Sequence, residues 1–131
     1  MARPRHKNPT PSELEILQII WENGPCTVRD VMNILKSTKS RAYTSVMSLM
    51  NVMAEKGMLK AKPEGRAFIY SASISQDKTQ SQMLKDILNR VFDGSASSLV
   101  SHLLNQAEPD GQELKEIHKT ITEFARKKGE K

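Results

Sequence analysis

Hydrophobic side chains recur three or four positions apart in three segments of the first half of the chain, over residues 12–23, 28–35 and 42–56. This spacing places them on one face of a helix, so it predicts three amphipathic helices in succession. The stretch between the second and third segments, residues 36–41, is polar and basic. It is predicted to form a turn or the entry to the third helix.

Start and stop signals mark the ends of these predicted helices. Ser12 with Glu15, and Thr27 with Asp30, have the spacing of a capping box, in which a hydroxyl and a carboxylate satisfy free N–H groups at a helix start. A Gly-Pro pair stops the first helix, and Gly57 lies where a residue of left-handed conformation would close the third.

The apolar period then shortens to two. Residues 58–62 and 66–71 are short strand-like runs, and Pro-Glu-Gly at residues 63–65 is a turn signal, so a β-hairpin is predicted. Trp21 and Phe68 are expected in the core. Three helices followed by a hairpin describe a winged helix-turn-helix, and the predicted fold class is mostly α with a small β-hairpin wing.

Three further helices are predicted after this hairpin, from Ser75 to about residue 93, over 96–105 and over 112–126. In the last, apolar residues follow one another at steps of 3, 4 and 3, as in a coiled coil. About 55 residues cannot enclose three apolar faces unaided, so these faces pack either on the first part of the chain or on a second copy. Their balanced charge favours a homodimer. The predicted dimerisation residues are Leu84, Ile87, Leu88, Val91, Leu99, Leu103, Leu114, Ile117, Ile121 and Phe124.

Charge divides the chain at the same place. The net charge is +5; residues 1–75 hold 11 Lys and Arg against 6 Asp and Glu, whereas residues 76–131 hold 9 of each. This asymmetry indicates a polyanionic partner for the first part, although a charge that merely keeps the surface soluble would give the same count. We therefore expect a basic N-terminal arm over residues 1–9, a winged-helix DNA-binding domain over 10–74 and a helical dimerisation domain over 75–131.

The outer face of the third predicted helix carries hydroxyl and amide side chains instead of the charge pairs of an ordinary exposed face. Such a helix fits a DNA major groove, where Thr44, Ser48 and Asn51 can hydrogen-bond to base edges. Nearby cations and a tyrosine hydroxyl would contact phosphates. The predicted backbone contacts are Lys39, Arg41, Tyr43, Lys60, Lys62 and Arg66. The competing hypothesis is a winged-helix adaptor whose basic face meets an acidic protein.

Several segments of the predicted winged helix are similar to one known family. Residues 10–17, 24–31, 42–47, 55–59 and 64–70 resemble, in order and spacing, the penicillinase-repressor (BlaI/MecI/CopY-type) regulators. The C-terminal part shares only their layout of three short helices. The resemblance implies a bacterial transcriptional repressor that dimerises through its C-terminal helices, binds a palindromic operator and blocks transcription.

Family positions carried over to this chain imply base contacts at the front of the third helix. Met47 stands where some members have arginine, and Val52 stands where a cation is common, so base preference and one phosphate contact are expected to differ. With Asn51 from the same outer face, the predicted base contacts are Thr44, Ser45, Met47, Ser48 and Asn51.

The resemblance also implies a way of release. Members that act in β-lactam resistance are cleaved in the fifth helix after a membrane sensor-protease is activated, which makes a sensor protease a further partner. His102–Leu103 is the equivalent position here, although the family's Asn-Phe bond is missing. The copper-responsive branch carries paired C-terminal cysteines, and this chain has only Cys26. Another inducing signal is the alternative, and apolar C-terminal helices that line a small-molecule pocket are a third hypothesis.

No motif of an enzyme, cofactor or metal site appears in the sequence. A phosphate loop, a zinc-protease motif and a nucleophile elbow are all missing, and His6, His102 and His118 are too far apart for ligand spacing. Cys26 is expected to be a buried spacer rather than a redox sensor. No apolar run approaches the roughly 20 residues that span a bilayer, and no secretory signal is present, so a cytoplasmic protein is expected.

Overall fold

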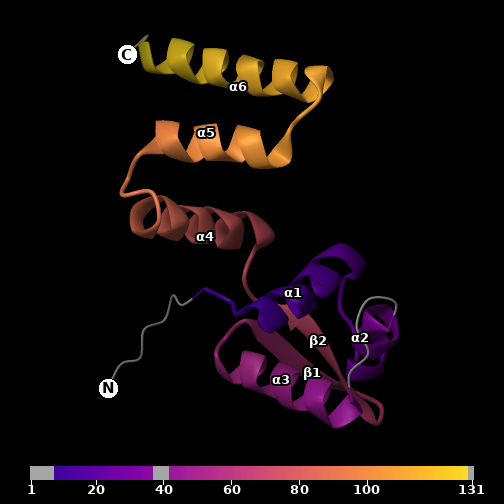
Figure 1. The fold of residues 1–131 in the computed structure, drawn as a ribbon. Helices are drawn as coiled ribbons and strands as arrows, with labels where there is room; N and C mark the ends of the chain where they lie inside the picture. The colour runs from indigo at the N-terminus through magenta and orange to yellow at the C-terminus, as the bar shows by residue number, and fades with distance from the viewer. Residues whose placement is uncertain (1–7, 37–41, 130–131) are drawn as a thin grey trace. The chain divides into compact units, whose positions relative to one another are not determined.

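The computed structural model describes residues 8–36 and 42–129, and these divide into two compact units, the first ending at Lys85 and the second beginning at Asp86. Figure 1 labels the helices and strands in chain order. They are α1 (Pro11–Asn23), α2 (Val28–Leu35), α3 (Tyr43–Glu55), β1 (Leu59–Glu64), β2 (Ala67–Ala72), α4 (Gln76–Arg90), α5 (Ala96–Ala107) and α6 (Gly111–Gly129). The predicted fold class, mostly α with a β-hairpin wing, is confirmed. Most of the predicted N-terminal arm lies outside the described residues.

The cap of α1 differs from the prediction. The hydroxyl of Thr10 accepts a hydrogen bond from the Glu13 N–H at 3.2 Å, and the Glu13 carboxylate accepts one from the Thr10 N–H at 2.9 Å. The predicted capping box of Ser12 and Glu15 is therefore wrong. Thr10 and Glu13 have the same spacing, and Pro11 between them suits the first position of a helix because it has no N–H to satisfy.

The other helix-end predictions of the first unit are confirmed. Thr27 and Asp30 form the reciprocal capping box of α2, with N–H to side-chain oxygen distances of 3.0 and 3.1 Å. Gly57 follows α3 with a φ of +87°, a backbone conformation that residues with a Cβ rarely adopt. These local signals place α2 and the end of α3 correctly because each depends only on residues within one helical turn.

The hairpin turn is tighter than predicted. Glu64 pairs with Ala67, so the turn consists of Gly65 and Arg66, and Pro63 lies within β1 opposite Phe68. The predicted turn over residues 63–65 is wrong, although Arg66 does lie at the tip. Proline is tolerated here because β1 is an edge strand of a two-stranded sheet, where a missing N–H leaves no partner unsatisfied.

The connection between α1 and α2 lies against the other edge of the hairpin. Cys26 and Tyr70 exchange two backbone hydrogen bonds, of 3.0 Å from the Cys26 N–H and 2.8 Å from the Tyr70 N–H. Cys26 is buried, as predicted, and burial raises the pKa of its thiol, with the nearby Asp30 charge adding to the shift. The thiol is therefore poorly suited to act as a thiolate.

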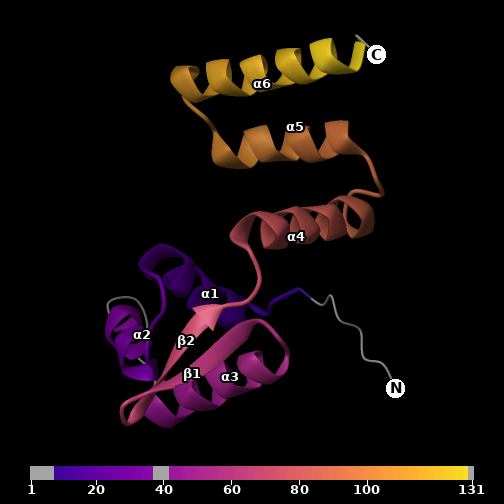
Figure 2. The same ribbon diagram turned by 180° about the vertical axis from the view of Figure 1, so that it is seen from behind.

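The core of the first unit is formed by α1, α2, α3 and the base of the hairpin (Figure 2). Its fully buried side chains are Ile16, Leu17, Val31, Val46, Met50 and Met53. Trp21 packs against this core and donates its indole N–H to the Ile74 carbonyl at 3.0 Å. Phe68, expected in the core, is instead 54% exposed, whereas Tyr70 is 2% exposed. Both point to the same face of β2, but the core extends under the hairpin only as far as Tyr70.

The second unit leaves many of its apolar residues exposed. α5 and α6 run side by side in opposite directions (Figures 1 and 2), and neither contains a buried residue. Ser95 caps the start of α5, and Glu108, which directly follows the last residue of this helix, has a left-handed backbone conformation. Both helices are longer than predicted at one end or both. The predicted domain boundary at 74/75 precedes α4, whereas the two compact units divide inside α4, so the functional division stays a prediction.

Candidate nucleic-acid interface

α3 separates an apolar face from an uncharged polar face. Val46, Met50 and Met53 point into the core. The predicted base contacts all lie on the exposed part of the helix: Thr44, Ser45, Met47, Ser48 and Asn51. No charged side chain occurs in α3 before Glu55. The result is a helix surface with hydroxyl and amide groups and a thioether, which can approach the edges of bases without burying an unpaired charge.

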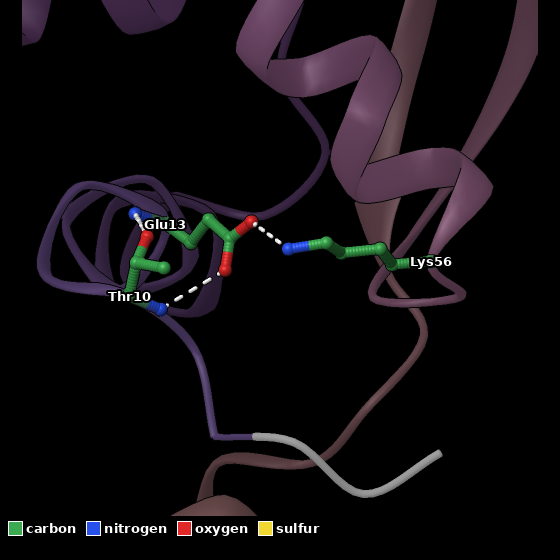
Figure 3. Close-up of polar contacts among 3 residues, drawn as sticks. All are labelled: Thr10, Glu13 and Lys56. Atoms are coloured by element: carbon green, nitrogen blue, oxygen red, sulfur yellow. Dashed lines mark hydrogen bonds and ion pairs between the residues drawn. The ribbon is translucent and has the colours of Figure 1, made fainter. Parts of the chain in front are cut away.

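The C-terminal end of α3 is tied to the start of α1 by an ion pair. The Lys56 ammonium lies 2.7 Å from the Glu13 carboxylate, which also accepts the Thr10 N–H (Figure 3). The Glu13 side chain is 3% exposed and that of Lys56 is 47% exposed. Burial alone would raise the pKa of Glu13, but the hydrogen bonds from Lys56 and Thr10 outweigh it and hold the pKa below 4.5. A buried, charged carboxylate thus fixes α3 relative to α1.

α3 is also joined to the hairpin. The Tyr70 hydroxyl donates to the amide oxygen of Asn51 at 2.9 Å, across 19 residues of sequence. This bond engages the amide oxygen of Asn51 and orients its side chain. The amide NH₂ group, a hydrogen-bond donor, is then the group that Asn51 offers to a partner. Since an adenine or guanine offers acceptors in the major groove, the contact predicted for Asn51 is that of a donor.

The basic side chains of the hairpin lie on its outer face. Lys60 pairs with Ser71 and Lys62 with Ile69, so both lysines point to the side opposite the buried Tyr70. Arg66 lies in the two-residue turn, and all three cations are exposed. Lys39 and Arg41, the remaining predicted cations, lie outside the described residues.

Arg29, on α2, is absent from the predicted contacts, yet the structure places it beside them. Its guanidinium carbon lies 5.3 Å from the centre of the Tyr43 ring, the distance of a cation–π contact. Tyr43 is 40% exposed and is the first residue of α3. A basic residue in the first turn of the second helix was the only sequence signal, and it does not reveal contact with a residue 14 positions later.

The predicted dimerisation and cleavage residues lie in the second unit and in the adjoining α4. Seven of the predicted dimerisation residues are more than 40% exposed: Leu84, Ile87, Val91, Leu103, Leu114, Ile121 and Phe124. Leu88, Leu99 and Ile117 are half-buried. His102 and Leu103 are consecutive exposed residues within α5, and the His102 ring packs against Phe92 with centroids 5.2 Å apart. α5 and α6 also leave an open apolar hollow lined by Leu104, Leu114, Ile117, His118 and Ile121.

In the parts of the chain that the structure describes, no three His, Cys, Asp or Glu side chains gather as a metal site would require. Within the same residues, no helix has the length and hydropathy needed to cross a membrane.

The first unit has three helices followed by a basic hairpin, and the third helix, α3, has an exposed uncharged face. These features together define a winged helix-turn-helix protein. The chain belongs to the penicillinase repressor family, whose model matches residues 9–123. The resemblance noted from the sequence is thus confirmed, and it extends into α6.

The chain is also similar to individual proteins. The chain is 25% identical to the penicillinase repressor of Bacillus licheniformis, over 91% of this chain and 93% of that protein. It is 20% identical to the penicillinase repressor of Staphylococcus aureus, over 88% of this chain and 92% of that protein. Among solved structures it is similar to the DNA-binding domain of the repressor BlaI, with 26% identity and a TM-score of 0.48 over 53% of this chain and 88% of that one.

Proposed function

We propose that this protein represses transcription by binding a palindromic DNA operator as a homodimer. Membership of a family of repressors supports the general activity. The observation that carries the DNA assignment is the exposed face of α3, which is free of charge as far as Ala54 while cations stand on the neighbouring elements. Such a repressor acts on the chromosome, so we place it in the cytoplasm.

In this proposal α3 enters the major groove and reads base edges. Thr44, Ser45, Met47, Ser48 and Asn51 make the base contacts. Tyr43, Lys60, Lys62 and Arg66, together with Lys39 and Arg41, hold the flanking phosphates. Phosphate contacts position the protein and provide most of the affinity, whereas the α3 side chains provide the discrimination between sequences.

The homodimer follows from the uncovered apolar residues of α5 and α6. Large apolar side chains that a single copy leaves exposed are stabilised when a second copy covers them. A two-fold dimer also presents two α3 helices to two half-sites, which suits a palindromic operator. The hollow between α5 and α6 shares Leu114, Ile117 and Ile121 with the predicted dimer surface, so the second copy is its simplest occupant.

Release from the operator is proposed to follow cleavage of α5 between His102 and Leu103 by a sensor protease. Both residues are exposed, but a protease needs an extended substrate, so α5 would have to unwind locally first. Mass spectrometry of the protein recovered from induced cells tests this step. A chain that stays intact while its target gene is expressed would point to another inducing signal.

The DNA assignment is tested by fluorescence anisotropy with duplexes carrying promoter dyads and with random duplexes of equal length. We expect tight binding to one dyad that weakens steeply as salt rises. Thr44→Ala and Ser48→Ala are expected to change the relative affinities for different operator sequences by about tenfold per altered contact, because they remove base contacts.

Arg66→Ala serves as the matched variant for a phosphate contact. It is expected to weaken binding to all duplexes alike and to lower the salt slope by about two, one for each protomer of the dimer. Equal affinity for dyads and random DNA at moderate salt would refute the repressor proposal. Early elution from DNA-cellulose in a salt gradient would favour the alternative, a winged-helix adaptor that binds an acidic protein.

A further inference from the structure

Arg29 and Tyr43 bring a cation from α2 to the first residue of α3. The guanidinium lies over the ring face at 5.3 Å, and both residues are exposed. A contact through the ring face leaves the N–H groups at the edge of the guanidinium available, because the attraction acts on the charge and not on the hydrogen-bond donors. The side chain of Arg29 is thus held in one region while its donors remain available to a ligand.

The place of this pair in the fold indicates which ligand it fits. In a helix-turn-helix, the helix before the recognition helix crosses the DNA backbone, while the start of the recognition helix approaches the bases; here these two helices are α2 and α3. Arg29 lies in the first turn of α2 and Tyr43 at the start of α3. The cap residue of α3 is Ala42, whose side chain makes no capping hydrogen bond. The positive end of the α3 dipole therefore adds to the field of Arg29 at this point.

Among the residues that the structure describes, Arg29 forms no ion pair with a carboxylate. The next residue, Asp30, accepts the Thr27 N–H as part of the α2 capping box, at 3.0 Å. One of its carboxylate oxygens is thereby engaged at the start of α2. Arg29 instead makes a cation–π contact with the Tyr43 ring, and a guanidinium beside a phenol hydroxyl presents several donors in a small space.

We propose that Arg29 and Tyr43 form a phosphate clamp that binds the DNA backbone next to the bases read by α3. This inference rests on the proposed DNA binding and adds Arg29 to it as a contact residue that α2 supplies. Arg29 donates N–H groups to a phosphate oxygen, and the Tyr43 ring orients it while the Tyr43 hydroxyl donates to the same phosphate. Arginine suits this role better than lysine because its planar fork can stack and donate at once.

The test measures anisotropy of the full-length protein with its preferred dyad duplex across a salt series. Arg29→Gln is expected to weaken binding about tenfold and to lower the salt slope by about two, one for each protomer of the dimer, equally for all duplexes. Arg29→Lys should keep the slope but lose part of the affinity, since it retains the charge and loses the stacked fork. Lys78→Gln, which removes an exposed cation from α4, is the matched control for loss of one charge.

A double-mutant cycle separates the two members of the clamp. Tyr43→Phe keeps the ring under the guanidinium and should cost less than Tyr43→Ala. In the Tyr43→Ala background the further effect of Arg29→Gln should shrink at least twofold, because the guanidinium is no longer held in place. Circular dichroism and thermal melting of each variant check that the fold is retained, as expected for exposed residues.

Duplexes with a single neutral methylphosphonate locate the phosphate. At one backbone position the methylphosphonate should weaken binding by the unsubstituted protein clearly more than binding by Arg29→Gln, in which only the Tyr43 hydroxyl still contacts that phosphate. If Arg29→Gln behaves like Lys78→Gln, or changes base preference instead of overall affinity, the clamp is refuted while operator binding stands. If the unsubstituted protein itself fails to bind any duplex, both the clamp and the proposed function are refuted.

Discussion

The two units contain helices with the same spacing of apolar residues, yet only the first unit buries the apolar faces of its helices. In the first unit Leu17, Met50 and Met53 are completely buried between helices and hairpin. In the second unit α5 and α6 contain no buried residue, and Phe124 is 69% exposed. The period of a sequence therefore predicts that a helix has an apolar face, but it does not say what covers that face.

This difference has a physical basis in the elements that each unit offers. Three helices and a hairpin approach one another from several directions, so they enclose a common volume. Two antiparallel helices meet along one line, which leaves most of their apolar surface outside the contact. We propose that a partner covers the rest, and the charge balance and the exposed apolar residues favour a second copy as that partner.

The largest effect is expected for a charge placed in the proposed dimer surface. Ile121→Asp should convert the dimer to monomers at micromolar concentration, because burying an unpaired carboxylate costs several kcal/mol, roughly 3–5. Light scattering should show the mass fall from twice the chain mass to 14.7 kDa. Thr122→Asp, an exposed neighbour on α6, is the control and should remain dimeric. A monomeric unsubstituted protein would contradict the dimer.

The next effect compares one substitution in both units. Leu17→Ala, at a completely buried position of α1, should lower the free energy of unfolding by about 3 kcal/mol. Leu103→Ala, at a position 51% exposed in α5, should cost less than about 1 kcal/mol in dilute protein. Urea unfolding at several protein concentrations measures both. A Leu103→Ala cost that is large and independent of concentration would mean that α5 is covered within one chain.

A smaller and pH-dependent effect is expected at the ion pair of the first unit. Because the pKa of Glu13 is lowered on folding, its charge stabilises the fold above pH 4.5 and loses this effect as pH falls through the folded pKa. Glu13→Gln should cost about 2 kcal/mol at neutral pH, and its difference from the unsubstituted protein should shrink as the pH falls below 4.5 and through the folded pKa. Urea unfolding at neutral pH and in a series below pH 4.5 measures this, with Glu22→Gln on the exposed face of α1 as control. A difference that persists unchanged in acid would contradict the charged state of Glu13.

The smallest effect on stability is expected at the tip of the hairpin. Phe68→Ala removes a side chain that is 54% exposed, so the free energy of unfolding should change by less than about 1 kcal/mol. Tyr70→Ala, on the same face of β2 but 2% exposed, should cost about 3 kcal/mol. Equal costs in urea unfolding would show that the hairpin tip is covered after all.

Much of the fold can be predicted from the chain because short-range patterns are decisive for it. Thr27 with Asp30 caps α2 and Gly57 follows α3, as their spacing predicts. The two local errors arise where two signals compete. Thr10–Glu13 and Ser12–Glu15 both have capping-box spacing, and Pro11 decides in favour of the first. Pro63 is a turn signal in sequence, but at an edge strand it is also compatible with β1.

By itself, the sequence determined the helices, their apolar faces, the hairpin and the family, because these depend on residue type and on spacing within a few positions. The tertiary structure alone decided which pairs of distant residues meet: Lys56 with Glu13, Tyr70 with Asn51, and Arg29 with Tyr43. It also decided that Phe68 stays exposed although Tyr70 is buried. Such contacts depend on how packed elements are placed against one another, and that placement follows from the whole core rather than from any local pattern.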